Sequence, residues 1–389
     1  MINYDNILSN KVKDIPYSGI RKFFSLAEEM DDVISLGVGE PDFLTPWTIR
    51  QEAIHSLQRG KTWYSANTGL LKLREEISRY MQRRFELSYN PSDICVTVGG
   101  SEAIDLCIRA VIQDGDEVLI PEPCFVCYSP IVQFQGGVPI LIPTNSENKF
   151  RLTASELKQN ITDKTKLLIL PFPNNPTGAV MRKKDLEELA DVLKDTNILV
   201  MSDEIYGELT YGEKHISIAS ISDDMFARTV VVSGFSKSYA MTGWRLGYAC
   251  GPTPIIEQMT KIHQYAIMCA PTTSQYAAIT ALKSCDEQVE QMRDEYDTRR
   301  KFLVDELIKI GLPCSCPEGA FYVFPCIEST GLTSEEFCEQ LLYAEKVAVV
   351  PGTAFGPSGE GYVRISYSYS IAHLSEALTR MKRFISDKS

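Results

Sequence analysis

The sequence lacks the features that would place a chain in a membrane or export it. No stretch approaches about 18 consecutive apolar residues, so no transmembrane helix is predicted. The start, residues 1–5, has no basic region followed by an apolar run, the pattern that begins an export signal. We therefore expect a cytoplasmic protein that has no membrane partner.

Positive charge is also in short supply. Lys and Arg number 39 against 51 Asp and Glu, which gives a formal net charge of −12. A surface with this balance repels phosphate backbones, so we expect no nucleic-acid partner. Small anionic substrates remain compatible with it, because a few local cations can dominate one pocket.

Histidine is scarce, and cysteine occurs without a metal-binding rhythm. The four histidines do not cluster in the sequence, and the 11 cysteines are scattered along it. The pair Cys124 and Cys127 has no second pair at the spacing of a zinc site. We predict no bound metal and expect these two cysteines to pack beside the functional site as reduced thiols.

The middle of the chain has the pattern of an α/β domain. Short runs rich in branched apolar residues alternate with helical periodicity, as in strands buried on both faces of a parallel sheet. These runs are Ile94–Val98, Glu117–Ile120, Lys166–Leu170, Ile198–Met201 and Thr229–Val232. Ligands of such sheets bind outside the carboxyl ends of the strands.

The pattern changes after about residue 280, and a chain of this length predicts about two domains. A long amphipathic stretch stops at Gly311, strand-like runs follow at Phe321–Phe324 and Tyr362–Ser366, and an amphipathic helix ends the chain. We predict a large α/β domain over residues 46–284. A smaller α+β domain is predicted from residues 1–45 and 285–389.

Chemistry-bearing residues follow the predicted strands. Gly99–Ala103 opens a helix, whose free N–H groups would suit a phosphate, although the dinucleotide and P-loop fingerprints are absent. Later strands are followed by residues 171–178, by Asp203 and Tyr206, and by Ser236, Lys237 and Arg245. Each alone has a plain structural interpretation as a turn, a cap or a surface residue. Together they supply the amine, the acid, the phosphate seat and the phenolic-oxygen donor that pyridoxal phosphate needs.

With these residues the chain resembles the class I/II aminotransferases of the fold-type I pyridoxal-phosphate enzymes. The similarity covers nearly the whole chain. Its motifs are Ser35–Asp42, Asn174–Gly178, Ser202–Tyr206, Ser236-Lys237, Met241–Gly247 and Tyr362–Arg364. The resemblance implies an α/β fold with a mostly parallel central sheet flanked by helices, and a smaller α+β domain.

The resemblance also implies roles for residues toward the cofactor. Lys237 would bond covalently to it and then move the substrate proton, and Asp203 would pair with the ring nitrogen. Tyr206 and Asn175 would bond the phenolic oxygen, and Phe125 would stack on the ring, where Trp or Tyr is common in the family. The phosphate would be held by Gly100, Ser101, Glu102, Ser236 and Arg245.

Substrate and partner contacts follow from the same resemblance. Arg364 would bind the substrate carboxylate, helped by the Gly39 backbone and by Asn175. Tyr64 matches a tyrosine that reaches the phosphate of a neighbouring subunit, which implies a homodimer with shared sites. The partners expected are therefore amino acids, 2-oxo acids and a second copy of the chain.

Function is predicted as transfer of an amino group from an L-amino acid of aromatic or broad type to 2-oxoglutarate, by a ping-pong mechanism. The overall sequence of these segments is similar to that of aromatic amino acid and acetyl-diaminopimelate aminotransferases of Gram-positive bacteria. N-acetyl-LL-diaminopimelate or aspartate is thus an alternative donor, although Ser101 stands where some acid-specific relatives carry a lysine. Two further functions stay open on the same scaffold, a carbon–sulfur β-lyase and a non-catalytic regulatory protein.

Overall fold

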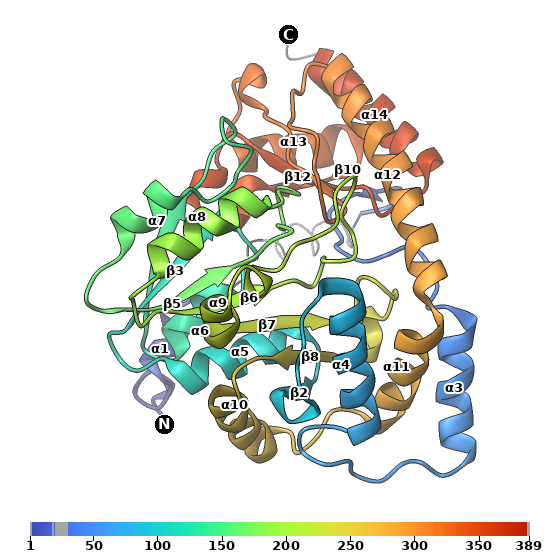
Figure 1. The fold of residues 1–389 in the computed structure, drawn as a ribbon. Helices are drawn as coiled ribbons and strands as arrows, with labels where there is room; N and C mark the ends of the chain where they lie inside the picture. Colours follow the sequence, from blue (N-terminus) through green and yellow to red (C-terminus); the bar gives the residue numbers. More distant parts are fainter. Residues whose placement is uncertain (1, 18, 20–29, 387–389) are drawn as a thin grey trace.

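A seven-stranded sheet forms the centre of the molecule in the computed structural model, which describes residues 2–17, 19 and 30–386. The strand order is β2-β8-β7-β6-β5-β3-β4 (Figure 1). The strands are β2 (Ile94–Thr97), β3 (Glu117–Glu122), β4 (Val138–Pro143), β5 (Thr165–Leu170), β6 (Leu199–Asp203), β7 (Thr229–Gly234) and β8 (Gly247–Cys250). All five predicted strands are therefore present.

The sheet is mostly parallel, as predicted, with one strand reversed. Strands β3 to β7 pair parallel, and β8 pairs antiparallel with both β7 and β2. Because Gly247 lies opposite both Thr97 and Gly234, the carboxyl ends of β2 and β7 meet at one edge. Neither β8 nor β4 was predicted, and the parallel interpretation of β2 is corrected, since its one neighbour runs the opposite way.

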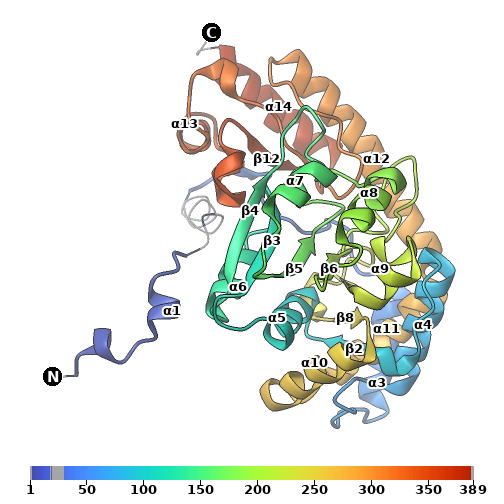
Figure 2. The same cartoon turned by 60° about the vertical axis from the view of Figure 1, so that its left-hand side comes forward.

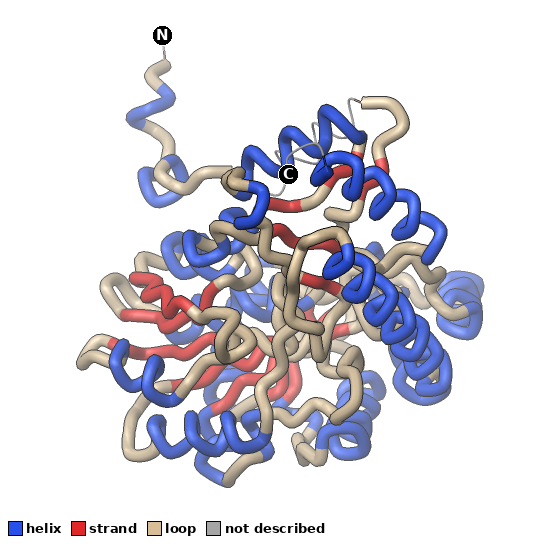
Figure 3. The backbone as a smooth tube through the Cα atoms, turned by 90° about the horizontal axis from the view of Figure 1, so that it is seen from above, coloured by secondary structure: helices blue, strands red, loops and turns tan. Residues whose placement is uncertain are grey.

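Helices cover both faces of the sheet because alternate strand residues point to opposite sides. Leu167 and Ile169 belong to a core with α5 and α10, whereas Leu168 and Leu170 pack against α8. Figure 3 shows the strands, in red, gathered among helices, in blue. Helices of this part are α3 (Trp47–Gln58), α4 (Leu71–Phe85), α5 (Gly100–Val111), α6 (Tyr128–Phe134), α7 (Ala154–Asn160), α8 (Lys183–Leu193), α9 (Asp223–Arg228), α10 (Thr253–Ala266) and α11 (Thr272–Ser284).

The C-terminal part has its own core and two small sheets (Figure 1, orange to red). One sheet joins β11, β12 and β9 antiparallel, and the other joins β1 to β10 parallel. The elements are β1 (Ile34–Ser35), β9 (Tyr322–Val323), β10 (Val347–Ala348), β11 (Val350–Pro351), β12 (Val363–Ser366), α12 (Asp286–Lys309), α13 (Ser334–Glu345) and α14 (Ile371–Ser386). The predicted long helix, with its end before Gly311, is confirmed.

The N-terminal residues divide between the two parts. Residues 34–35 join the C-terminal sheet through β10, whereas α1 (Asn10–Lys13) projects from the body in Figure 2. Lys11 forms an ion pair of 2.8 Å with Asp114, which lies between β2 and β3 in the chain. The predicted domain over residues 1–45 includes 1, 18 and 20–29, which lie outside the described residues, and the domain boundaries stay a prediction. Across the part of the chain that is described, no helix combines the length and the apolarity needed to cross a membrane.

Candidate active site

A cavity of about 640 Å³ opens where the carboxyl ends of the central strands meet the C-terminal part. Parallel strands bring residues far apart in sequence to one edge of the sheet. The cavity is lined by most of the predicted site residues, namely Gly39, Gly100, Ser101, Phe125, Asn175, Asp203, Tyr206, Ser236, Lys237, Arg245 and Arg364. The structure therefore assembles one site from segments spread over more than 300 positions.

Lys237 is the amine of this site. It lies in the loop after β7, and its Nζ donates a hydrogen bond of 2.6 Å to the carbonyl oxygen of Gly39. Burial, together with the nearby guanidinium groups of Arg364 and Arg245, lowers the pKa of Lys237 to about 8, although the charge of Glu40 opposes the shift. A substantial fraction of the amine is therefore neutral near physiological pH, as a nucleophile or base requires.

Asp203 is the acid at the floor of the cavity. It ends β6, and its carboxylate accepts hydrogen bonds from Tyr128 Oη at 2.8 Å and from the Ile205 N–H at 3.2 Å. Burial raises the pKa of Asp203 to about 6, although the hydrogen bond from Tyr128 opposes the shift. A cationic ligand group beside Asp203 would restore its charge at low energetic cost.

The N-terminus of α5 forms the anion seat of the cavity. The helix begins at Gly100, and no side chain caps it at Gly99. The first N–H groups of a helix have no partner within the helix and carry a positive dipole end. Ser236 and Arg245 lie on the same cavity, and Arg245 packs so closely on Gly99 that a Cβ there would lie 2.6 Å from its guanidinium.

Arg364 on β12 is a buried cation with neutral neighbours. Its guanidinium donates to Asn175 Oδ1 at 2.9 Å and to the Gly37 carbonyl oxygen. It also lies 4.5 Å from the ring centre of Tyr322 and 4.7 Å from that of Phe355. Its Nε is buried without a hydrogen-bond partner. A buried charge in this condition calls for an anion such as a carboxylate.

Tyr206 faces the same cavity and bonds to a second tyrosine. Its hydroxyl lies 2.9 Å from the hydroxyl of Tyr322, which also lines the cavity. The sequence interpretation missed both Tyr322 and Tyr128. The sequence placed Tyr322 only in a strand-like run. Tyr128 comes directly after the pair Cys124 and Cys127, and the signal that could have identified it is its position after the carboxyl end of β3.

Two predicted residues do not line the cavity. The Glu102 side chain turns back to the Val98 N–H and to His263 Nδ1, 2.7 Å away, so only its backbone stays at the helix N-terminus. Tyr64 is 75% exposed on the single chain. A phosphate role for Tyr64 stays a prediction, and it would require a second subunit.

Pyridoxal phosphate fits the chemistry of these groups. The uncapped α5 with Ser236 and Arg245 suits its phosphate, and the buried carboxylate of Asp203 suits a protonated ring nitrogen. Lys237 supplies the amine for a covalent link. The donor set thus matches each charged part of that cofactor.

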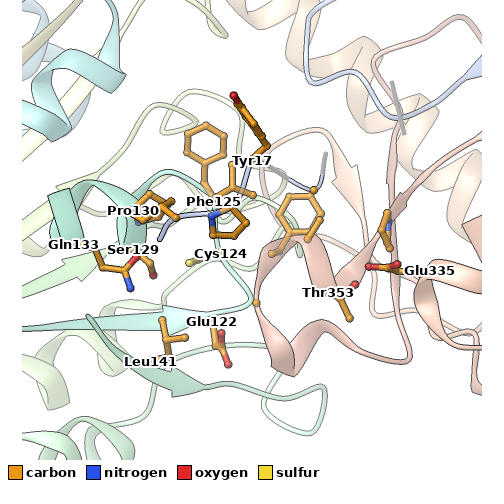
Figure 4. Close-up of a pocket in the computed structure, with 18 residues that line it drawn as sticks. Tyr17, Glu122, Cys124, Phe125, Ser129, Pro130, Gln133, Leu141, Glu335 and Thr353 are labelled. Carbon is orange, nitrogen blue, oxygen red and sulfur yellow. The ribbon is translucent and has the colours of Figure 1, made fainter. Parts of the chain in front are cut away.

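A second cavity of about 430 Å³ adjoins the first and shares Phe125 and Val126 with it. Figure 4 shows Tyr17 from the N-terminal segment at one end and Glu122 and Leu141 from neighbouring strands at the other. The buried thiol of Cys124 lies on its wall, and burial raises the pKa of this thiol, which disfavours a reactive thiolate.

Comparison with known proteins gives a consistent picture. The family model for aminotransferase class I and II matches residues 31–381. The putative aminotransferase YugH of Bacillus subtilis (strain 168) is 54% identical over 97% of this chain and 98% of its own. An aspartate aminotransferase of Pyrococcus abyssi is 49% identical over 98% and 99%. A crystal structure of an aromatic aminotransferase from Pyrococcus horikoshii OT3 has a TM-score of 0.90 and 48% identity, over 95% of this chain and 99% of that one. The chain therefore belongs to the class I and II aminotransferases, enzymes of fold type I that depend on pyridoxal phosphate.

Proposed function

We propose that the enzyme transfers the amino group of an aromatic or broad range of L-amino acids to 2-oxoglutarate, in two alternating half-reactions at one cavity. The observation that carries this proposal is the position of Lys237, whose amine shares one cavity with the acid Asp203 and the cation Arg364. When bound, pyridoxal phosphate supplies a carbonyl group that takes up the amino group and a ring that withdraws electrons from the substrate Cα.

Lys237 moves the proton in this proposal. Among the described residues that line the cavity, it has the only side-chain amine. Its depressed pKa, about 8, lets Nζ take a proton from the substrate Cα and return it later. Asp203, held by Tyr128, keeps a negative charge beside the ring nitrogen and so favours its protonated form.

The remaining residues hold and orient. Gly100, Ser101 and Glu102 would present the N–H groups of α5 to the phosphate, and the Ser236 hydroxyl and the Arg245 guanidinium would complete that seat.

Ring and substrate contacts complete the assignment. Tyr206 would donate to the phenolic oxygen with help from Asn175, and Phe125 would pack on the ring, since all three line the cavity. Arg364 binds the substrate carboxylate, which would give its Nε the hydrogen-bond partner that it lacks in the single chain. The Gly39 backbone lies beside this carboxylate position in the proposal.

Donor preference is argued from the charges of the cavity. Within the described lining, the cations are Lys237, Arg245 and Arg364, and each already has a role. A dedicated acid enzyme needs a further cation for the distal carboxylate, and position 101 is a serine. One similar protein is named for aspartate and another for aromatic amino acids, which supports a broad donor range.

The proposal includes a homodimer. Large apolar side chains are exposed on the single chain near Tyr64, including Trp63, Tyr265 and Met268. Two hydrogen bonds join the segment around Trp63 to the segment that follows α10. Asn67 donates to the Met268 carbonyl oxygen at 2.9 Å, and Thr272 donates to the Trp63 carbonyl oxygen. Exposed apolar side chains on two segments that are hydrogen-bonded to each other form a patch, which supports the proposal that a second copy of the chain covers it. A cytoplasmic location is also proposed, supported by 11 cysteines that are all free.

A donor panel tests the substrate assignment. Phenylalanine, tyrosine, aspartate and N-acetyl-LL-diaminopimelate are offered separately with 2-oxoglutarate, and glutamate formation is measured. We expect turnover with the aromatic donors and slower turnover with aspartate. Turnover with aspartate or the acetylated donor alone contradicts the proposed range. Pyruvate release from cysteine-type substrates without an oxo acid would support a carbon–sulfur β-lyase instead.

Lys237→Ala tests the proposed catalytic amine. The variant should retain its fold and lose turnover by at least about a thousand-fold, because the nucleophile and base are both removed. Lys261→Ala is the matched control, since Lys261 is exposed and bonds only Gln258 on its own helix. Full activity of Lys237→Ala would refute the assignment.

A further inference from the structure

Tyr322 lies at the junction of three groups of the proposed site. It begins β9, its side chain is fully buried, and its hydroxyl is 2.9 Å from the hydroxyl of Tyr206. The two rings meet edge to face, with centres 5.9 Å apart. This pair links the C-terminal sheet to the loop that follows β6.

The number of hydroxyl protons decides which tyrosine donates in the hydrogen bond between Tyr206 and Tyr322. Each tyrosine hydroxyl has one proton to donate and can accept another bond. When Tyr206 gives its proton to a ligand oxygen, the bond between the two hydroxyls requires Tyr322 to be the donor. In the described part of the chain, Tyr206 is the hydrogen-bond partner of the Tyr322 hydroxyl, so no competing acceptor diverts that proton.

The surroundings of Tyr322 hold it in place. The guanidinium of Arg364, the proposed carboxylate-binding group, lies 4.5 Å from the centre of the Tyr322 ring. Gly39 packs against its hydroxyl so closely that a Cβ at Gly39 would clash with the oxygen. The same Gly39 accepts the hydrogen bond from Lys237. Tyr322 therefore touches the supports of both cofactor and substrate without being the proposed partner of either.

We propose that Tyr322 is a positioning residue with two separable effects. Its hydroxyl donates to Tyr206 and leaves the single Tyr206 proton for the phenolic oxygen of the cofactor. Its ring, together with that of Phe355, contacts the Arg364 guanidinium and holds it ready for a substrate carboxylate. Hydrogen bonds in such a chain strengthen one another, so the first effect is felt at the cofactor. This proposal rests on the proposed function of Tyr206 and Arg364.

The hydroxyl is tested with Tyr322→Phe in the enzyme loaded with pyridoxal phosphate. The readout is the pH midpoint of the absorbance change of the bound cofactor, which reports how well the phenolic oxygen is stabilised. Weaker donation from Tyr206 leaves more negative charge there and favours the protonated covalent link. We expect the midpoint to rise by about 0.5 pH unit, the scale of one hydrogen bond. The KM for both substrates should stay within about two-fold, because the ring is kept.

Two further variants separate the effect of the hydroxyl from that of the ring. Tyr206→Phe combined with Tyr322→Phe should have the midpoint of Tyr206→Phe alone, since Tyr322 acts through Tyr206. Tyr322→Leu, which removes the ring, should raise the KM of both substrates by about ten-fold or more. Tyr367→Phe is the control, because it loses a buried hydroxyl bond of 3.0 Å to Ala320 outside the cavity and should leave the midpoint unchanged.

The results distinguish this proposal from the function on which it rests. An unchanged midpoint in Tyr322→Phe, or an additional shift in the double variant, overturns the relay. A KM for Tyr322→Leu equal to that of the unsubstituted protein overturns the role of the ring. Absence of amino transfer by the unsubstituted protein would instead refute the proposed function.

Discussion

Among single residues, Asp203 and Lys237, which line the same cavity, are both driven toward neutrality by burial. The pKa of Asp203 rises to about 6 and that of Lys237 falls to about 8. Desolvation disfavours the charged form of each. Hydrogen bonds at Asp203 and the nearby negative charge of Glu40 at Lys237 compensate only in part. Perturbed groups of this kind gather where a ligand completes the charge balance.

The depressed pKa of Lys237 predicts the pH dependence of cofactor uptake. The neutral amine attacks a carbonyl, and its fraction grows as pH rises through about 8. After removal of the cofactor, the rate of reconstitution with pyridoxal phosphate should rise about ten-fold from pH 7 to pH 9 and then level off. Stopped-flow absorbance measures this rate. A rate that is flat over this range would show that the amine is not the titrating group.

Asp203→Asn should stabilise the cofactor-free protein. The raised pKa means that folding favours the protonated carboxyl, so its contribution to stability is complete below about pH 4 and is lost as pH rises through about 6. At pH 7.5 the variant should therefore unfold with a free energy higher by on the order of 2 kcal/mol.

Denaturant unfolding at pH 4 and pH 7.5 checks this expectation, because the advantage of the Asp203→Asn variant should shrink at the lower pH. The loaded variant should lose most of its turnover, since the ring nitrogen lacks an anionic partner. Equal stability at pH 7.5 would mean that water reaches the carboxylate in the cofactor-free protein.

At the scale of elements, the start of α5 shows how a backbone turn creates a binding site. Gly99 has φ +78°, a value that only glycine adopts without strain, and it delivers the chain into the helix at the edge shared by β2 and β7. No side chain caps this helix, and its first two residues, Gly100 and Ser101, line the cavity. The loss of a cap is a local cost that a bound anion can offset.

Gly99→Ala should weaken cofactor binding beyond its effect on the fold. A Cβ at Gly99 meets the Arg245 guanidinium, so the arginine must move away from the seat. Gly115→Ala is the matched control, because Gly115 has φ +87° with nothing near its Cβ position. Both variants should lose about 1–2 kcal/mol of stability from the left-handed backbone.

Only Gly99→Ala should lose affinity for pyridoxal phosphate, by about ten-fold. Equilibrium titration of the cofactor-free variants by fluorescence gives the comparison. Equal affinities in the two variants would contradict the assignment of Arg245 to the phosphate seat.

For the whole molecule, the single chain leaves large apolar side chains exposed around Tyr64. Tyr265 is 85% exposed on α10, close to the loop that carries Trp63 and Tyr64. A lone chain gains nothing from this exposure, whereas in the proposed dimer a second copy would bury it.

Tyr265→Glu should weaken the proposed dimer. A carboxylate buried in an apolar interface loses hydration without a partner, which costs enough to raise the dissociation constant by about a hundred-fold. Sedimentation velocity across a concentration series measures the change. Tyr343→Glu serves as control, because Tyr343 is 53% exposed on α13 in the C-terminal part. A substitution at Tyr265 that leaves the oligomeric state as it was would move the interface elsewhere.

The positions of five central strands, the chemistry at their ends and the family resemblance could all be obtained from the sequence. Local patterns carry this information, because a strand buried on both faces requires branched apolar residues and a helix end requires a stop such as Gly311. Lys237, Asp203 and Arg364 were found because each stands at a motif in the chain. The reversed strand β8 was not, since a run of four small and aromatic residues has no direction of its own.

What only the tertiary structure decided is which side chains meet across distant segments. Tyr128 reaches Asp203 over 75 positions and Tyr322 reaches Tyr206 over 116. Neither tyrosine lies in a motif, and its role follows from the partner that folding places opposite its hydroxyl. The shifted pKa values of Asp203 and Lys237 arise in the same way, because desolvation depends on all the atoms that exclude water from the cavity.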